Sequence, residues 1–178
     1  MKSKWDKLRL IEKAALFAER AHEGQVRKYT GEPYIVHPAE VARIVSTLVT
    51  ADDIIIAAAW LHDVVEDTDV TDADLRREFG EYVANHVWWL TDISTPKDGN
   101  RAARKAIDRK HIAGAGPSVQ TIKLADLISN TSTITRFDPE FAKVYLAEKR
   151  ALLEVLTSGN ATLHAVATAL AKDCEGTP

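Results

Sequence analysis

The sequence AAAWLHDVVEDT, residues 57–68, begins as an apolar run and ends with four ionisable side chains within six residues. The apolar part is typical of a buried helix. Its ionisable residues are His62, Asp63, Glu66 and Asp67. Charges at the end of a core helix need partners, because burying an unpaired charge is costly. A divalent metal ion would be such a partner, since imidazole and carboxylate together suit first-row metals.

The spacing of these residues makes the hypothesis more specific. Residues three and four apart share one face of a helix. Glu66 follows His62 by four residues and Asp63 by three, and Asp67 follows Asp63 by four. One helix end could therefore hold a metal with the first pair and present two carboxylates beside it. Those carboxylates could orient or deprotonate a water molecule. A solvated polar helix end is the alternative interpretation, and it is the usual one for an isolated histidine–aspartate pair.

The composition is that of a packed globular protein, with 178 residues of which 46% are hydrophobic and 28% charged. A formal net charge of -3 gives no global basic field that would attract nucleic acid. The single cysteine, Cys174, excludes an intramolecular disulfide and fits a reducing compartment. No signal-peptide pattern opens the chain and no apolar run reaches membrane-spanning length. We therefore expect a cytoplasmic protein with no membrane partner.

Apolar residues recur at helical spacing along the chain, without strand-like alternation, an internal repeat or a dividing linker. His22 would be a boundary residue at the end of the first helix. Pro38 suits the first turn of the next helix, which places His37 just before the helix start. We predict an all-α fold, a single helical bundle domain over residues 1–178 with a frayed tail at 173–178.

A second candidate position is Asp126, the one carboxylate in an otherwise largely apolar helix predicted over residues 119–133. A single carboxylate in such surroundings favours a cation as its partner. Asn130 lies four residues after Asp126 and Thr133 a further three, so the three side chains share one helix face.

Basic and aromatic residues mark further candidate contacts. Arg27 and Lys28 adjoin in a loop, either as a solvated pair or as a clamp for phosphate or a base. Residues 101–110 form the most basic segment, usually just a solvated helix face, which could steer a phosphate-rich substrate. Trp88 and Trp89 fit either the core or a subunit contact, so a homo-oligomer remains open.

Three motifs in this order resemble the HD-type hydrolase domain of RelA/SpoT proteins, and more closely the stand-alone small alarmone hydrolases. The motifs are RKYTGEPYIVHP at 27–38, LHDVVEDT at 61–68, and KLAD at 123–126 followed by Asn130. The resemblance is collinear over about residues 11–156 and implies the helical bundle of an HD domain.

The resemblance also implies a metal site and a catalytic pair. Glu66 and Asp67 match the paired acids that are expected to activate the attacking water. The metal of the family is typically Mn²⁺, although a mixed nitrogen and oxygen ligand set does not exclude iron or zinc. The residues that the resemblance places around the metal are His37, His62, Asp63 and Asp126.

The reaction of that family removes pyrophosphate from the 3′ position of a guanosine 5′-di- or triphosphate 3′-diphosphate. The resemblance thus implies a hydrolase of (p)ppGpp, or of adenosine analogues such as pppApp, in the stringent response. Arg27 is expected to stack on the base with Lys28 close by. The residues implied along the sugar and phosphates are Asn130, Thr133 and Tyr145.

The chain departs from this family at two positions. The family's hydrolases often carry a lysine soon after Thr91-Asp92, where this chain has Ile93-Ser94. The basic residue commonly found one turn before Tyr145 is Phe141 here. Another basic side chain could compensate, and the preference between guanine and adenine stays open. The candidates for that compensation are Lys97, Lys143, Arg104 and Arg109.

Two other functions remain as alternatives. The first is an HD phosphohydrolase of another nucleotide, such as a nucleoside monophosphate. The Glu66–Asp67 pair and the Arg27–Lys28 loop favour the alarmone hydrolase over it. The second is a sensor that binds a nucleotide without turnover. Retention of both acids argues against it, because a pure binder has no need of a water-activating pair.

Overall fold

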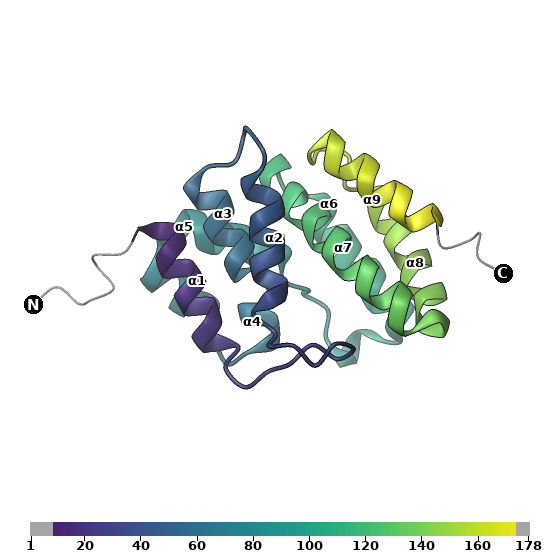
Figure 1. Ribbon diagram of the computed structural model, residues 1–178, viewed down its shortest axis with the longest axis horizontal. Coiled ribbons are helices and arrows are strands. Elements are labelled where there is room, and N and C mark those ends of the chain that lie inside the picture. Colours follow the sequence, from purple (N-terminus) through teal and green to yellow (C-terminus); the bar gives the residue numbers. More distant parts are fainter. Residues whose placement is uncertain (1–8, 174–178) are drawn as a thin grey trace, which may run out of the picture. The chain divides into compact units, whose positions relative to one another are not determined.

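The computed structural model describes residues 9–173, and Figure 1 shows their helices. Within these residues the extended backbone pairing consists of an isolated antiparallel bridge between Val26 and Pro33. The predicted all-α fold is confirmed. Cys174 and the rest of the predicted tail lie outside the described residues, while Asp173 still belongs to the last helix.

Two compact units make up the chain, Met1–Thr91 and Asp92–Pro178. The single domain over residues 1–178 therefore stays a prediction. No helix of the described residues is both long enough and apolar enough to cross a membrane.

Helix α3 is the centre of the first unit, because it packs against α1, α2 and α5. Its three consecutive alanines at 57–59 have no exposed surface, and such small side chains let the neighbouring helices approach closely. Asp52 accepts a hydrogen bond from the Ile55 amide at 2.9 Å and so caps the helix, as its position before the apolar run predicts. The helices of this unit are α1 (Leu10–Ala21), α2 (Val36–Ser46), α3 (Asp53–Leu61), α4 (Val64–Asp67) and α5 (Asp72–Leu90).

Two helix boundaries differ from the sequence prediction. Helix α2 begins at Val36, so His37 is its second residue and does not precede it. Proline is tolerated throughout a first helical turn, because the amides there have no intrahelical acceptor. The stretch 57–68 is also not one helix: α3 ends at Leu61, and α4 starts at Val64. Asp63 is the N-cap of α4, which turns the chain between the two helices.

Helix α7 has the corresponding central position in the second unit, where α8 and α9 pack against it. It runs longer than the predicted 119–133 because Pro117 opens it and the cap at Asp138 closes it. The helices of this unit are α6 (Arg101–Ala113), α7 (Pro117–Phe137), α8 (Pro139–Leu153) and α9 (Ala161–Asp173), preceded by the short 3-10 helix η2 (Pro96–Asp98).

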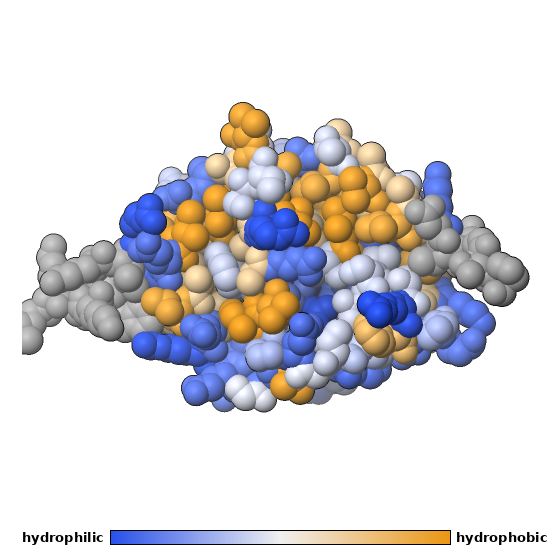
Figure 2. All heavy atoms as spheres, viewed as in Figure 1, coloured by the Kyte–Doolittle hydropathy of each residue, from blue (hydrophilic) through white to orange (hydrophobic). Residues whose placement is uncertain are grey.

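Hydrophobic residues form several groups on the face shown in Figure 2, and hydrophilic residues lie between these groups. Trp88 is 44% exposed, and its ring meets that of Trp89 edge to face at 4.8 Å between centroids. Trp88 is therefore a partly exposed residue on α5 and not a core residue.

Candidate metal centre and surrounding site

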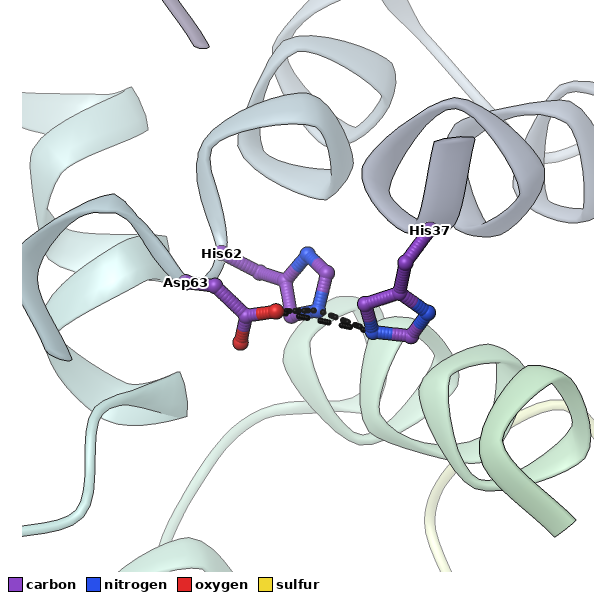
Figure 3. A group of neighbouring side chains, drawn as sticks. All are labelled: His37, His62 and Asp63. Carbon is purple, nitrogen blue, oxygen red and sulfur yellow. Dashed lines mark hydrogen bonds and ion pairs between the residues drawn. The ribbon is translucent and has the colours of Figure 1, made fainter. Parts of the chain in front are cut away.

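Three side chains from separate elements of the first unit converge in Figure 3. His37 comes from the first turn of α2, His62 directly follows α3, and Asp63 caps α4. Each offers one ligand atom, and these atoms all lie within 4.8 Å of one another. Both imidazoles are 2% exposed. The break between α3 and α4 allows this arrangement, because it turns the consecutive side chains of His62 and Asp63 toward the same point.

The Nε2 atoms of the two imidazoles, His37 and His62, face each other in this group. His62 Nδ1 lies 2.9 Å from the Ala59 carbonyl oxygen, which can only accept. In the neutral ring Nδ1 therefore carries the proton and Nε2 has a lone pair. That Nε2 lies 3.3 Å from Nε2 of His37 and 3.1 Å from Oδ2 of Asp63. The distance from His37 Nε2 to Asp63 Oδ2 is 3.5 Å.

These separations fit a bound cation. With ligand bonds of about 2.1 Å, neighbouring ligand atoms lie roughly 3.0–3.4 Å apart in octahedral or tetrahedral coordination. The three measured separations are 3.1–3.5 Å. Two imidazoles and one carboxylate also form a donor set that first-row divalent metals accept. His37, His62 and Asp63 could therefore hold one metal ion with little rearrangement.

Asp67 and Tyr34 lie beside this group. The Tyr34 hydroxyl is 2.7 Å from Oδ2 of Asp63 and 2.8 Å from Oδ2 of Asp67. Burial raises the pKa of Asp67, the charge of Asp63 raises it further, and the Tyr34 hydrogen bond opposes both. Burial and the two carboxylates also raise the pKa of Tyr34, so its hydroxyl keeps its proton and remains a donor. Sequence reasoning did not assign Tyr34, although it stands three residues before His37.

Glu66 and Lys28 are exposed, as Asp67 is, whereas Arg27 is half-buried. Glu66 lies on the exposed side of α4. Arg27 is half-buried in a narrow loop, where its amide donates to the Glu32 carbonyl at 2.8 Å. Lys28 is exposed and its ammonium lies 4.7 Å from the centre of the Tyr29 ring. The loop thus fixes the backbone of Arg27 and leaves Lys28 at the surface.

Asp126 belongs to the second unit and is 5% exposed on α7. Lys123 pairs with its Oδ2 at 2.9 Å, and Asn130 donates to its Oδ1 at 2.6 Å. The predicted shared helix face of Asp126 and Asn130 is confirmed by this bond. The carboxylate also has a cationic neighbour from its own helix, which the sequence reasoning did not identify.

The remaining predicted substrate residues lie on α7 and α8. Thr133 and Tyr145 are half-buried. The Tyr145 ring lies 6.4 Å from that of Phe141, and the Arg101 guanidinium lies 5.4 Å from the Phe141 ring centre. Arg101 is held by Glu148 through two hydrogen bonds of 2.6 and 2.9 Å. A cation therefore stands beside the position where Phe141 replaces a basic residue, and it is not one of the four named from the sequence.

His22 is a second residue near the site whose burial was not predicted from the sequence. It was expected at a helix boundary, and it does cap the C-terminus of α1, but it is buried with 3% exposure. Its ring lies against that of Tyr34 with 4.6 Å between centroids. The signal that could have indicated this is its position close to the 27–38 motif.

Comparison with known proteins identifies the family. The family model described as HD domain matches residues 14–155. A GTP pyrophosphokinase of Streptomyces coelicolor is 42% identical over 128 residues, which are 71% of this chain and 15% of that protein. The human guanosine-3′,5′-bis(diphosphate) 3′-pyrophosphohydrolase is 40% identical over 130 residues, 71% of this chain and 70% of the human one.

A solved structure has the same fold over nearly the whole chain. It is that of a metazoan ortholog of SpoT that hydrolyses ppGpp, and it matches with a TM-score of 0.84 and 26% identity. The match covers 99% of this chain and 98% of that one. The chain belongs to the HD domain family and is a relative of the guanosine-3′,5′-bis(diphosphate) 3′-pyrophosphohydrolases.

Proposed function

We propose that this chain is a metal-dependent hydrolase that removes pyrophosphate from the 3′ position of ppGpp and related nucleotides. The observation that carries the proposal is the group His37, His62 and Asp63, with a second carboxylate, Asp67, beside it on α4. The human relative of similar length is named for this reaction, which supports the choice of substrate class. The larger relatives extend well beyond the matched region, so their other activities are not carried over.

The metal we propose is Mn²⁺, held by the two imidazoles and Asp63. When bound, it would supply positive charge that stabilises the charge developing on the phosphate and lowers the pKa of water. The assignment of Asp126 as a further ligand is part of this proposal and rests on the sequence resemblance. Loss of metal affinity in an Asp126→Asn variant would support that assignment, and unchanged affinity would contradict it.

The protein side chains have distinct roles in the proposed reaction. Glu66 and Asp67 orient the attacking water and accept its proton, and burial already raises the pKa of Asp67 toward that of a useful base. The water oxygen bonds to the phosphorus attached to O3′, the P–O3′ bond breaks, and O3′ takes up a proton. The products are a 3′-hydroxyl and pyrophosphate. Arg27 and Lys28 are the residues that we propose for the base.

The test is turnover by the purified protein with Mn²⁺ and a panel of nucleotides, with the products separated by chromatography. Pyrophosphate released from a 3′-diphosphate supports the proposal. Orthophosphate released from other nucleotides would point to a different HD phosphohydrolase, and binding without products to a sensor.

Two variants separate metal binding from catalysis. Glu66→Ala should lose about 10²- to 10⁴-fold in kcat and keep its metal, because only proton transfer is removed. Asp63→Ala should lose both. Glu19→Ala is the matched control, since Glu19 is exposed on α1. Full activity in the Glu66 variant would contradict its assigned role.

A further inference from the structure

Asp67 is held at two points by the segment that precedes α2. Its side chain Oδ2 accepts from the Tyr34 hydroxyl at 2.8 Å, and its backbone carbonyl accepts from the Gln25 side-chain amide at 2.8 Å. The two bonds fix different parts of the same residue. The backbone bond sets where the end of α4 lies, and the hydroxyl bond sets which way the carboxylate points.

Gln25 and Tyr34 face each other at the base of one narrow loop. The Tyr34 amide donates to the Gln25 carbonyl at 2.9 Å, and the bridge between Val26 and Pro33 follows directly. Arg27 lies next along the loop, where its amide donates to the Glu32 carbonyl. The loop that carries the basic pair is thus attached to Asp67 through its base.

His22 determines the orientation of the Gln25 amide. Its Nδ1 lies 2.8 Å from Oε1 of Gln25, and Oε1 can only accept, so the nitrogen of that amide is directed to the Asp67 carbonyl. The His22 ring also lies against the Tyr34 ring, which restricts the swing of the phenol. One buried imidazole therefore supports both contacts to Asp67.

The Tyr34 hydroxyl has one proton and two carboxylate neighbours, Asp63 and Asp67. Two carboxylates that share a site repel each other. A single donor between them offsets part of that repulsion and keeps Asp67 beside Asp63 instead of letting it turn to solvent. A phenylalanine in this place would keep the ring packing and lose only this restraint.

We propose that Tyr34 and Gln25 are positioning residues that hold Asp67 in its reactive orientation and connect the Arg27–Lys28 loop to it. This inference rests on the proposed function, in which Asp67 acts on the attacking water. Neither residue is proposed to touch the reacting phosphorus. Their effect should therefore fall on kcat, because the misdirected carboxylate no longer meets the water, and leave KM nearly unchanged.

The experiment compares Tyr34→Phe and Gln25→Met with Tyr82→Phe, which loses the same hydroxyl from a 75% exposed tyrosine of α5. Turnover is measured at saturating Mn²⁺, and amide hydrogen exchange is measured over α4. We expect kcat to fall about 10- to 100-fold in Tyr34→Phe and at least severalfold in Gln25→Met, with KM within about twofold. Exchange of the Asp67 amide, which donates to the Asp63 carbonyl, should accelerate in both variants and not in the control.

Metal affinity distinguishes positioning from loss of the metal site. Gln25 bonds the Asp67 backbone and not a proposed ligand, so Gln25→Met should bind Mn²⁺ as the wild type does. Equal kcat in the wild type and both variants would overturn the inference. An inactive wild type would instead refute the proposed function. The exchange measurement would still show whether Tyr34 and Gln25 restrain Asp67. Unchanged amide exchange over α4 in both variants would show that the Tyr34 and Gln25 hydrogen bonds do not hold Asp67 in place.

Discussion

Removal and return of the metal should change the stability of the first unit by an amount that the ligand geometry allows us to estimate. The three ligand atoms lie 3.1–3.5 Å apart, close to the separations in a coordinated ion. Binding therefore needs little rearrangement, which favours a low Kd. A metal that binds only the folded chain then stabilises it by an amount that depends on the ratio of its free concentration to Kd. At a free Mn²⁺ concentration of 100 times Kd, that linkage is about 2.7 kcal/mol.

This free energy corresponds to a measurable shift in the unfolding temperature. For a chain of this length, 1 kcal/mol changes Tm by about 2–4 °C, so Mn²⁺ should raise it by roughly 5–11 °C over the chelated protein. Intrinsic tryptophan fluorescence is a suitable probe of this unfolding. All four tryptophans precede residue 92, so they belong to the unit that holds His37, His62 and Asp63.

Two variants make the result specific to the site. Asp63→Ala removes the carboxylate that faces both imidazoles and should abolish the shift. Asp69→Ala removes an exposed carboxylate two residues after α4 and should preserve it. No shift in the wild type at saturating Mn²⁺, or an equal shift in Asp63→Ala, would refute the assignment of these three residues to the metal.

The other two predictions concern the fold. Gly159→Ala should destabilise the second unit by about 1–3 kcal/mol in urea unfolding, because the added Cβ would lie 2.7 Å from Leu124 Cδ1 and 3.1 Å from the Gln120 backbone carbon. Gly116→Ala meets no atom within 4 Å and should change stability by less than about 0.5 kcal/mol, so equal losses would disprove the steric account. Asp74 has a pKa lowered to about 2, first by the Thr71 hydroxyl and then by the Thr71 amide. A lowered carboxyl pKa stabilises the fold above the ordinary value near 4 and loses that effect as the pH falls through about 2. The stability difference between wild type and Asp74→Asn should therefore shrink to about half between pH 7 and pH 3, and a constant difference would contradict this cause.

The helical class and the main helices follow from local patterns in the chain, and the same patterns predict the chemistry of the site. Helical spacing and caps such as Asp52 are local properties, and local properties can be read from neighbouring residues. The pairing of His62 with Asp63 was likewise visible, because the two are adjacent in the chain. The motif at 27–38 indicated His37 through its resemblance to a known family, not through any local physical rule.

How these residues come together depends on contacts between segments that are distant in the chain. The break between α3 and α4 depends on how α3 packs among its neighbours, and no periodicity in residues 57–68 indicates it. The contacts of Gln25 and Tyr34 with Asp67 join segments 42 and 33 residues apart. Such contacts depend on the three-dimensional path of the chain, so composition and spacing carry no signal for them. For the same reason no role for His22 could be predicted, because its burial follows from the helices and loop packed around it.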